Sequence, residues 1–246
     1  MDGRMMQPCA TTLLSTTIAG KKLQFRQPTL TLWILFAILC SLPACTPAIV
    51  DSALTDIQAI WTNQPPDAPE EIQQQLVAVD VHYYGFDRKL HQGQVVIHKE
   101  LAPDIRQLFA VIRETRFPVE SVLPIAHPLV QLKGPFGLSP DTNNTSAYVW
   151  RPIVGSRTVS LHGLGLAIDF NPRLNPYCKG DLILPPGATY EPTKPGTLTP
   201  GSRVVQAFKE LGWEWGGDWA EKGKVDYMHF QKIPSQLEPW VKNYRK

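Results

Sequence analysis

Two short stretches, far apart in the chain, contain side chains whose types and spacing could support metal chemistry. The first contains His162 and Asp169, and the second contains Asp226 and His229. Histidine nitrogens and carboxylate oxygens are zinc ligands, and a catalytic zinc uses three protein ligands so that its fourth position stays open for the water it activates. His162, Asp169 and His229 are therefore candidate ligands. Asp226, close to the third of them in sequence, is left free to act as a base.

The chain must bend between the first two candidate ligands. Side chains alternate between the two faces of a strand, so Ile168 and Phe170 would face a core while Asp169 faces a cleft. His162 and Asp169 are seven residues apart and would point to opposite faces of a straight strand. We therefore expect a turn or bulge at the glycines between them, because glycine tolerates the backbone angles that such a bend needs.

The same alternation separates the residues of the second stretch. Asp226 is three residues before His229 and would point away from it on a regular strand. We therefore expect Asp226 on the loop that enters the strand of His229. On that strand, Met228 and Phe230 share the face opposite to His229 and Gln231.

Each of these residues alone has a more ordinary interpretation. A histidine beside glycine is more often a hydrogen-bonded or surface side chain, and an aspartate after an apolar run often caps a helix or turn. The other histidines near aromatic or apolar residues have no partner at a ligand spacing, and we expect surface or structural roles for His82, His91, His98 and His127. The sequence has no His-Glu-x-x-His, no Cys-x-x-Cys and no glycine-rich phosphate loop, which argues against zincins, zinc fingers and nucleotide enzymes.

The joint pattern is more specific than its parts. Ser-x-His-x-x-Gly-x-Ala-x-Asp, which begins at Ser160, is followed by Trp-Gly-Gly-Asp-Trp and Asp-x-x-His-Phe. Together these motifs resemble the D-alanyl-D-alanine carboxypeptidase and L-alanyl-D-glutamate peptidase family of bacterial cell-wall zinc metallopeptidases, over roughly residues 78–234. The resemblance implies one zinc ion per chain, held by His162, Asp169 and His229.

The resemblance also implies roles for the residues around the metal. Asp226 matches the catalytic carboxylate, Arg151 matches the arginine that steadies the substrate carbonyl and the developing oxyanion, and Ser160 matches a small polar residue that supports the site. Without the resemblance, an arginine after an aromatic residue more often pairs with a surface acid. Arginine suits the implied role because its guanidinium stays charged and presents a fork of donors.

The implied reaction is hydrolysis of an amide bond in peptidoglycan stem peptides. The closing motifs, with Asp226 rather than glutamate as the base, look more like the L-alanyl-D-glutamate endopeptidases than the D-alanyl-D-alanine carboxypeptidases of this family, and a groove left open by the proline-rich loop would suit the longer peptide. Trp213, Trp215 and Trp219 could form a wall of that groove, although two of the three are equally well explained as core residues. The alternative function is a non-catalytic, lipid-anchored peptidoglycan-binding protein that uses the same cleft. The complete set of catalytic residues favours the enzyme.

Residues 1–44 have the pattern of a signal peptide. Basic residues precede an apolar run at 30–42, which is shorter than the roughly 20 residues of a membrane span. The run ends in Leu-Pro-Ala-Cys, which resembles a lipobox and implies that Cys45 is lipidated. We therefore expect an exported protein, lipid-anchored at the periplasmic face of a cell-envelope membrane or secreted. An uncleaved anchor and ordinary cleavage near Ala44 are the alternatives.

The remaining chain predicts one domain after a linker. Proline and glutamine at 45–76 favour a lipid-tethered linker, with a short helix at 53–61, and leave 77–246 as the zinc peptidase domain. Without residues 1–44 the chain has 20 basic and 21 acidic residues, which gives no basic footprint for nucleic acid. We expect a monomer, with peptidoglycan stem peptides and the membrane as its partners. Cys178 has no partner for an internal disulfide once Cys45 is lipidated.

Helical and strand patterns are mixed along this domain. Apolar residues recur at helical spacing in 101–115 and again in 204–211, where Gly212 predicts the end of a helix. Residues 175–201 contain six prolines, which predicts a long irregular loop at the rim of the site. The fold class is therefore α+β. The resemblance implies a small antiparallel sheet flanked by helices, with the zinc site in a cleft on the sheet, as in Hedgehog proteins and D,D-peptidases.

Overall fold

The computed structural model describes residues 47–133 and 143–245. The predicted signal peptide and Cys45 lie outside these described residues. Within them, helices and short strands are mixed and most strand pairs are antiparallel, which is compatible with the predicted α+β class. No helix in the described part of the chain is long and apolar enough to cross a membrane.

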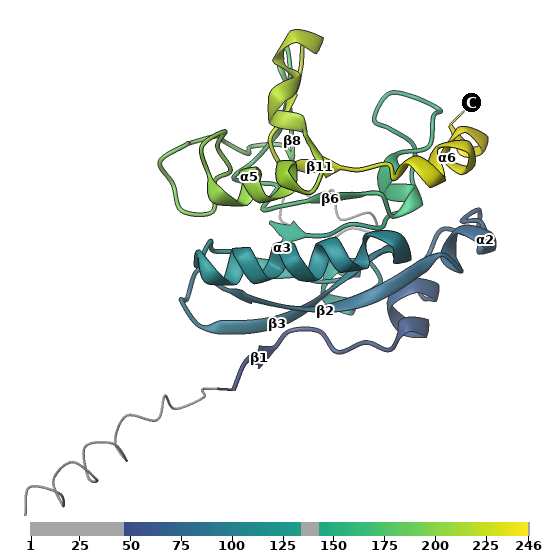
Figure 1. The fold of residues 1–246 in the computed structure, drawn as a ribbon, viewed down its shortest axis with the longest axis horizontal. Coiled ribbons are helices and arrows are strands. Elements are labelled where there is room, and N and C mark those ends of the chain that lie inside the picture. Colours follow the sequence, from purple (N-terminus) through teal and green to yellow (C-terminus); the bar gives the residue numbers. More distant parts are fainter. Residues whose placement is uncertain (1–46, 134–142, 246) are drawn as a thin grey trace, which may run out of the picture. The chain divides into compact units, whose positions relative to one another are not determined.

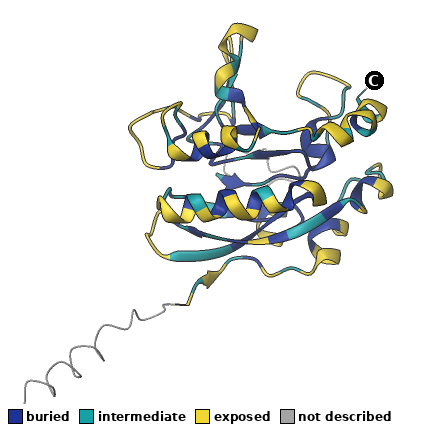
Figure 2. Ribbon diagram, viewed as in Figure 1, coloured by how far each residue is buried: buried dark blue, intermediate teal, exposed yellow. Residues whose placement is uncertain are grey.

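A long hairpin and one helix form the lower layer of the view in Figure 1. Strand β2 (Leu76–Tyr84) pairs antiparallel with β3 (Leu90–His98) over its whole length. Helix α3 (Ala102–Glu114) packs on β2 and has proline in its first turn, where the missing N–H costs nothing. Its buried face consists of Ala102, Ile105, Leu108, Phe109 and Ile112. The helix predicted from the spacing of apolar residues in 101–115 is thus confirmed. Figure 2 shows its buried and exposed sides.

A second antiparallel sheet contains one candidate ligand from each of the two stretches, Asp169 and His229. Its strand order is β6 (Ala167–Asp169), β11 (His229–Gln231) and β9 (Glu214–Trp215). The register sets His229 directly opposite Asp169. Aromatic rings join this sheet to the helices: the Phe170 and Phe109 ring centroids are 5.8 Å apart, and Phe208 of α5 (Arg203–Glu210) stacks on Phe230 at 3.9 Å.

The proline-rich segment differs from its prediction. Residues 175–201 contain a hairpin of β7 (Tyr177–Lys179) and β8 (Leu182–Leu184), and β10 (Val225–Asp226) adds to β7 as a third strand. The strands form because the prolines flank them rather than interrupt them. Gly180 supplies a left-handed residue at the turn, with φ +56°. Beyond β8 the segment is irregular, as predicted.

The N-terminal segment also differs from its prediction. The described part of the predicted linker, from residue 47 onward, has elements of its own that pack on the domain. Strand β1 (Ile49–Val50) pairs parallel with β3, and the helices η1 (Ile57–Trp61) and α2 (Glu70–Gln73) bury Ile60 and Ile72 in the core. These few apolar contacts outweigh the linker-like composition. The helix expected at 53–61 is present as a shorter turn of π-helix.

The remaining elements are short and connect the two main sheets. Strands β4 (Ser121–Val122) and β5 (Asn144–Thr145) pair parallel. The other helices are η2 (Lys99–Leu101), α4 (Pro128–Gln131), η3 (Leu161–Leu164), η4 (Gly216–Lys222), η5 (Ser235–Leu237) and α6 (Glu238–Tyr244). In Figure 1, η3 and α6 lie at the same end of the second sheet.

Candidate metal centre

His162 lies on a single helical turn that the sequence defines at both ends. Ser160 caps η3, because its Oγ accepts a hydrogen bond from the His162 backbone N–H at 3.3 Å. Gly165 ends the turn at φ +64°. A Cβ at Gly165 would lie 2.7 Å from the His98 backbone nitrogen and 2.5 Å from Leu76 Cδ2. The bend expected between His162 and Asp169 is therefore present, and it requires glycine.

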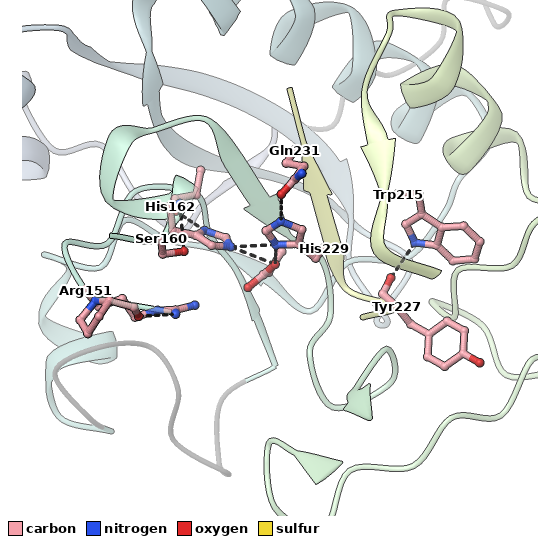
Figure 3. A network of polar contacts seen from close by, with 10 residues as sticks. Arg151, Ser160, His162, Trp215, Tyr227, His229 and Gln231 are labelled. Atoms are coloured by element: carbon pink, nitrogen blue, oxygen red, sulfur yellow. Dashed lines mark hydrogen bonds and ion pairs between the residues drawn. The ribbon is translucent and has the colours of Figure 1, made fainter. Parts of the chain in front are cut away.

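Three potential ligand atoms converge beside this turn. His229 Nδ1 lies 3.1 Å from Asp169 Oδ1, and His162 Nε2 lies 3.2 Å from the same oxygen. The two imidazole nitrogens are 3.1 Å apart. His162 is 2% exposed and His229 is 8% exposed. Figure 3 shows both rings turned toward one another, so the structure brings together the three predicted ligands.

In each histidine, the outer ring nitrogen, which faces away from the other two ligand atoms, has a hydrogen-bond acceptor beside it. His162 Nδ1 donates to the Ala147 carbonyl at 2.6 Å. His229 Nε2 donates to Gln231 Oε1 at 3.1 Å (Figure 3). Gln231 is oriented by its own donation to Glu214 at 2.9 Å. When the outer nitrogens carry the protons, both inner nitrogens present lone pairs. Two lone pairs and a carboxylate oxygen therefore face one space, and this donor set fits a divalent cation such as zinc.

The pKa shifts give two of the three groups, His162 and Asp169, the protonation state that binds a metal. Burial lowers the pKa of His162, which keeps this ring neutral. Burial works against Asp169, yet the two neighbouring histidines hold its pKa well below the ordinary value. Burial also opposes a charge on His229, but the hydrogen bond and charge of Asp169 raise its pKa. A neutral histidine and an ionised carboxylate are the forms that bind a metal.

Asp226 lies on β10, in the sheet of β10, β7 and β8, and not on a loop as the sequence predicted. It ends β10, opposite Tyr177, and a two-residue turn separates it from His229. Its Oδ1 is buried and has no hydrogen-bond partner among the residues that the structure describes. Burial raises the pKa of Asp226 to about 7, and the negative charge of Asp169 adds to this effect. A Cβ at Gly216 would lie 2.4 Å from the Asp226 carbonyl oxygen, so glycine is required beside it.

Arg151 and Ser160 are neighbours across a narrow loop. The Ser160 N–H donates to the Arg151 carbonyl at 3.1 Å, and Pro152 pairs with Val159 in an isolated bridge. Arg151 Nη1 donates to the Pro152 carbonyl at 3.3 Å, while its Nε is buried without a partner. Figure 3 shows Arg151 and Ser160 on the same side of His162.

A cavity of about 290 Å³ joins these groups. Every residue proposed from the sequence for the site, apart from the lipidation position, lines it: Arg151, Ser160, His162, Asp169, Asp226 and His229. Trp219 also lines it, whereas Trp213 and Trp215 are core residues at 3% and 1% exposure. The interpretation of two of the three tryptophans as core residues is thus confirmed.

Other lining residues were missed by sequence reasoning. These are Tyr177, Leu184, Lys222, Lys224, Gln231 and Arg245, together with apolar residues of the 151–160 loop and Met228. Gln231 could have been found, because it shares the strand face of His229. Tyr177 and Leu184 belong to the hairpin that the prolines concealed. Nothing in the sequence points to Arg245.

Three of the other described histidines have structural contacts, in line with the surface or structural roles expected for them. His91 lies between Asp51 and Asp87, at 2.9 and 3.1 Å. His98 is buried and packs edge-on against Trp240, and His127 caps α4. None of them lines the cavity of the candidate ligands.

Comparison with known proteins supports the interpretation of this site. Residues 154–232 match the family described as D-alanyl-D-alanine carboxypeptidase. The matched segment contains His162, Asp169, Asp226 and His229, and it excludes Arg151 and everything after residue 232. No curated protein and no solved structure matches the chain. Residues 154–232 are thus similar to the D-alanyl-D-alanine carboxypeptidase family, and this match supports a peptidase domain around the candidate ligands.

Proposed function

We propose that this protein is a zinc-dependent peptidase that hydrolyses an amide bond in peptidoglycan stem peptides. The observation that carries the proposal is the convergence of His162, Asp169 and His229 in the cavity that also contains Asp226 and Arg151. The family match supports a peptidase acting on the cell wall. The inward-facing lone pairs of the histidines support a metal as its cofactor.

The residues of the cavity divide the chemistry between them. Bound zinc would lower the pKa of a water molecule to about 7 and polarise the scissile carbonyl. Asp226 Oδ1 has no partner to lose and can take the proton of the attacking water and return it to the leaving amine. Arg151 offers donors to the carbonyl oxygen as negative charge develops there.

A second cavity supports an endopeptidase over a carboxypeptidase. A space of about 630 Å³ is lined by Pro65, Trp150 and Arg157, and it shares Arg151 and Val154 with the cavity of the candidate ligands. A peptide that is cut internally needs room on both sides of the scissile bond. The two cavities meet at Arg151 and together give this room. We therefore favour cleavage between L-alanine and D-glutamate.

The location of the enzyme is part of the proposal. A signal peptide at residues 1–44 and a lipidated Cys45 would hold the peptidase on the periplasmic face of a membrane, beside its substrate. Cleavage without lipidation would instead release it into the envelope. In either case the enzyme works on peptidoglycan and has no nucleic-acid partner.

Purified stem peptides test the proposed reaction directly. The mature protein, loaded with zinc, is incubated with muropeptides and the products are identified by mass spectrometry. A cut between L-alanine and D-glutamate supports the endopeptidase, and release of one terminal D-alanine moves the assignment to a D,D-carboxypeptidase. Binding of the muropeptides without any cut would instead establish the non-catalytic alternative.

A further inference from the structure

The C-terminal helix brings a guanidinium group to the cavity of the candidate ligands. Arg245 directly follows α6 and lines this cavity together with His162 and Asp226. It lies outside the segment that matches the family, which ends at residue 232. The proposed reaction gives Arg245 no role.

Unpaired polar atoms are concentrated at this cavity. Five buried side-chain nitrogen or oxygen atoms lack a hydrogen-bond partner within the described residues. Three of them belong to residues that line the cavity: Arg151 Nε, Asp226 Oδ1 and Arg245 Nε. A buried polar group without a partner is destabilising, and such groups are rare in folded proteins. A substrate that completes these bonds explains why all three occur together.

The charges around the cavity favour an anionic ligand. Four cationic side chains line it, Arg151, Lys222, Lys224 and Arg245, against the two carboxylates of Asp169 and Asp226. The ammonium groups of Lys222 and Lys224 already lie over the Trp219 ring, at 5.0 and 5.1 Å from its centroid. Arg245 has neither an ion pair nor a ring contact in the described part of the chain.

The chemistry of the guanidinium narrows the ligand to a carboxylate. Burial lowers the pKa of Arg245 from its usual value, so its surroundings already disfavour an uncompensated charge. A carboxylate would compensate this charge and could accept two parallel hydrogen bonds from the guanidinium fork. A peptide carbonyl could offer one acceptor and no charge.

We propose that Arg245 binds a carboxylate of the substrate and thereby positions the stem peptide in the cavity. The inference rests on the proposed function, because it assumes that the cavity receives a stem peptide. Such a peptide has two carboxylates of the required chemistry, one at its C-terminus and one on the α-carbon of its γ-linked D-glutamate. The two sources are distinguished by amidating one carboxylate at a time.

Three synthetic peptides test the proposal. The first is L-alanyl-γ-D-glutamyl-L-lysyl-D-alanyl-D-alanine, the second is its C-terminal amide, and the third carries D-isoglutamine in place of D-glutamate. With the zinc-loaded wild-type protein, we expect one amidation to lower kcat/KM by about 10- to 100-fold, as for the loss of a charge-assisted hydrogen-bond pair. In Arg245→Gln, kcat/KM for the acid should fall by the same factor and the penalty of that amidation should disappear.

The matched control is Lys242→Gln. Lys242 lies on α6, just before Arg245, and its substitution removes the same charge, but it is exposed and lines a different cavity, with Glu214 and Glu238. Lys242→Gln should lose as much kcat/KM on amidation of the peptide as the wild type does. Arg245→Lys should show part of this loss, because a point charge remains. Circular dichroism of all variants should be unchanged, since Arg245 follows the last helical turn.

The results separate the inference from the proposed function. An equal amidation penalty in Arg245→Gln and the wild type would overturn the role of Arg245, as would a wild type that is indifferent to both amidations. If the wild type cuts none of the peptides, the proposed function fails. The same peptides then remain intact during calorimetry, which measures their affinity. Tighter binding of the free acid than of the amide by the wild type, with this difference lost in Arg245→Gln, supports the inference. Absence of this difference overturns it.

Discussion

The two histidines of the candidate metal centre present different ring nitrogens to the same space. His162 offers Nε2 and His229 offers Nδ1. The difference follows from their outer partners, a backbone carbonyl for one and the amide of Gln231 for the other. Such partners fix the ring and its tautomer in advance of any metal binding. The sequence could predict which histidines meet, but it could not predict which nitrogen of each would be the ligand.

Removal of either histidine should remove the metal. We expect one zinc ion per chain in the wild type and less than one tenth of that content in His162→Ala and in His229→Ala, because two ligands cannot hold a structural or catalytic zinc tightly. His82→Ala is the control, since His82 does not line the cavity. Elemental analysis after dialysis measures the content. Full zinc occupancy in either site variant would show that the ligand assignment is wrong.

Asp226 should separate catalysis from metal binding. Asp226→Asn should keep zinc and lose at least about 10²-fold in kcat, because an amide cannot take the proton of the attacking water. The control is Asp218→Asn, because Asp218 is paired with Lys209 at 2.6 Å and does not line the cavity. Stopped assays of peptide cleavage measure both variants. Near-normal turnover in Asp226→Asn would require another base.

Asp226 should also lower the free energy of unfolding of the metal-free protein near pH 7. The pKa of Asp226 is raised to about 7 in the folded state, from an unfolded value near 4. Between these values the folded state binds more protons, so the free energy of unfolding falls as the pH rises from 4 to 7. Asp226→Asn should therefore raise the melting temperature of the metal-free protein at pH 7 and not at pH 4. Calorimetry in EDTA at both pH values measures the difference, and an equal melting temperature at pH 7 would contradict it.

At the scale of elements, the register of β6 and β11 determines which side chains meet. The pairing sets His229 opposite Asp169 and Phe230 opposite Ile168, so one face is polar and the other is core. This alternation was predictable from the apolar and polar residues along each strand. The place of Asp226 was not, because β10 and β7 are too short to show a periodic pattern and their pairing joins residues about 50 positions apart.

The turn that holds His162 gives a prediction at the same scale. Gly165→Ala should lower the free energy of unfolding by about 3 kcal/mol or more, from the left-handed backbone and the clash with the His98 backbone nitrogen. Gly155→Ala is the matched control, because Gly155 has φ +73° but nothing within 4 Å of an added Cβ. Its cost should be about 1 to 2 kcal/mol from the backbone alone. Urea denaturation compares the two, and equal costs would contradict the steric argument.

His98, at the junction of β3 and η2, should make stability depend on pH. It is 1% exposed, and burial lowers its pKa to about 4, against about 6.5 when unfolded. Between these values the unfolded chain binds more protons, so the free energy of unfolding should fall by roughly 3 kcal/mol as the pH drops from 6.5 to 4. His98→Gln should lose this slope relative to the wild type. Urea denaturation in EDTA from pH 4.5 to 7.5 tests it, and an unchanged slope in the variant would refute it.

At the scale of the whole molecule, the sequence indicated the α+β class and the long helix because their periodic patterns extend over many residues. The extent of the domain was not predictable in this way. Residues 47–75 have the prolines and glutamines of a linker, yet contacts such as Ile72 in the core and the hydrogen bond of Ser52 to Gln94 at 2.6 Å hold them on the domain. Composition averages over a segment, whereas packing depends on individual side chains.

Lipidation is tested on the full chain. Cys45→Ser should accumulate as a larger, unprocessed protein, and the wild type should partition into the detergent phase with a mature amino terminus at Cys45. Ala44→Ser is the control, because it keeps the cysteine and a small residue before it. Gel mobility, phase partition and mass spectrometry of the amino terminus measure the outcome. An amino terminus elsewhere would disprove lipidation at Cys45.

If Cys45 carries a lipid anchor, the packing of the N-terminal segment limits the distance between the domain and that anchor. A flexible linker of about 30 residues would give an average reach of roughly 30 Å. In this protein β1 begins at Ile49 and is already paired with β3, so the few residues after Cys45 span at most about 14 Å. A lipid on Cys45 would thus hold the domain against the bilayer, and the enzyme would process the layer of wall nearest the membrane. Its distance from the membrane would be set by the size of the folded domain and not by the length of a flexible linker.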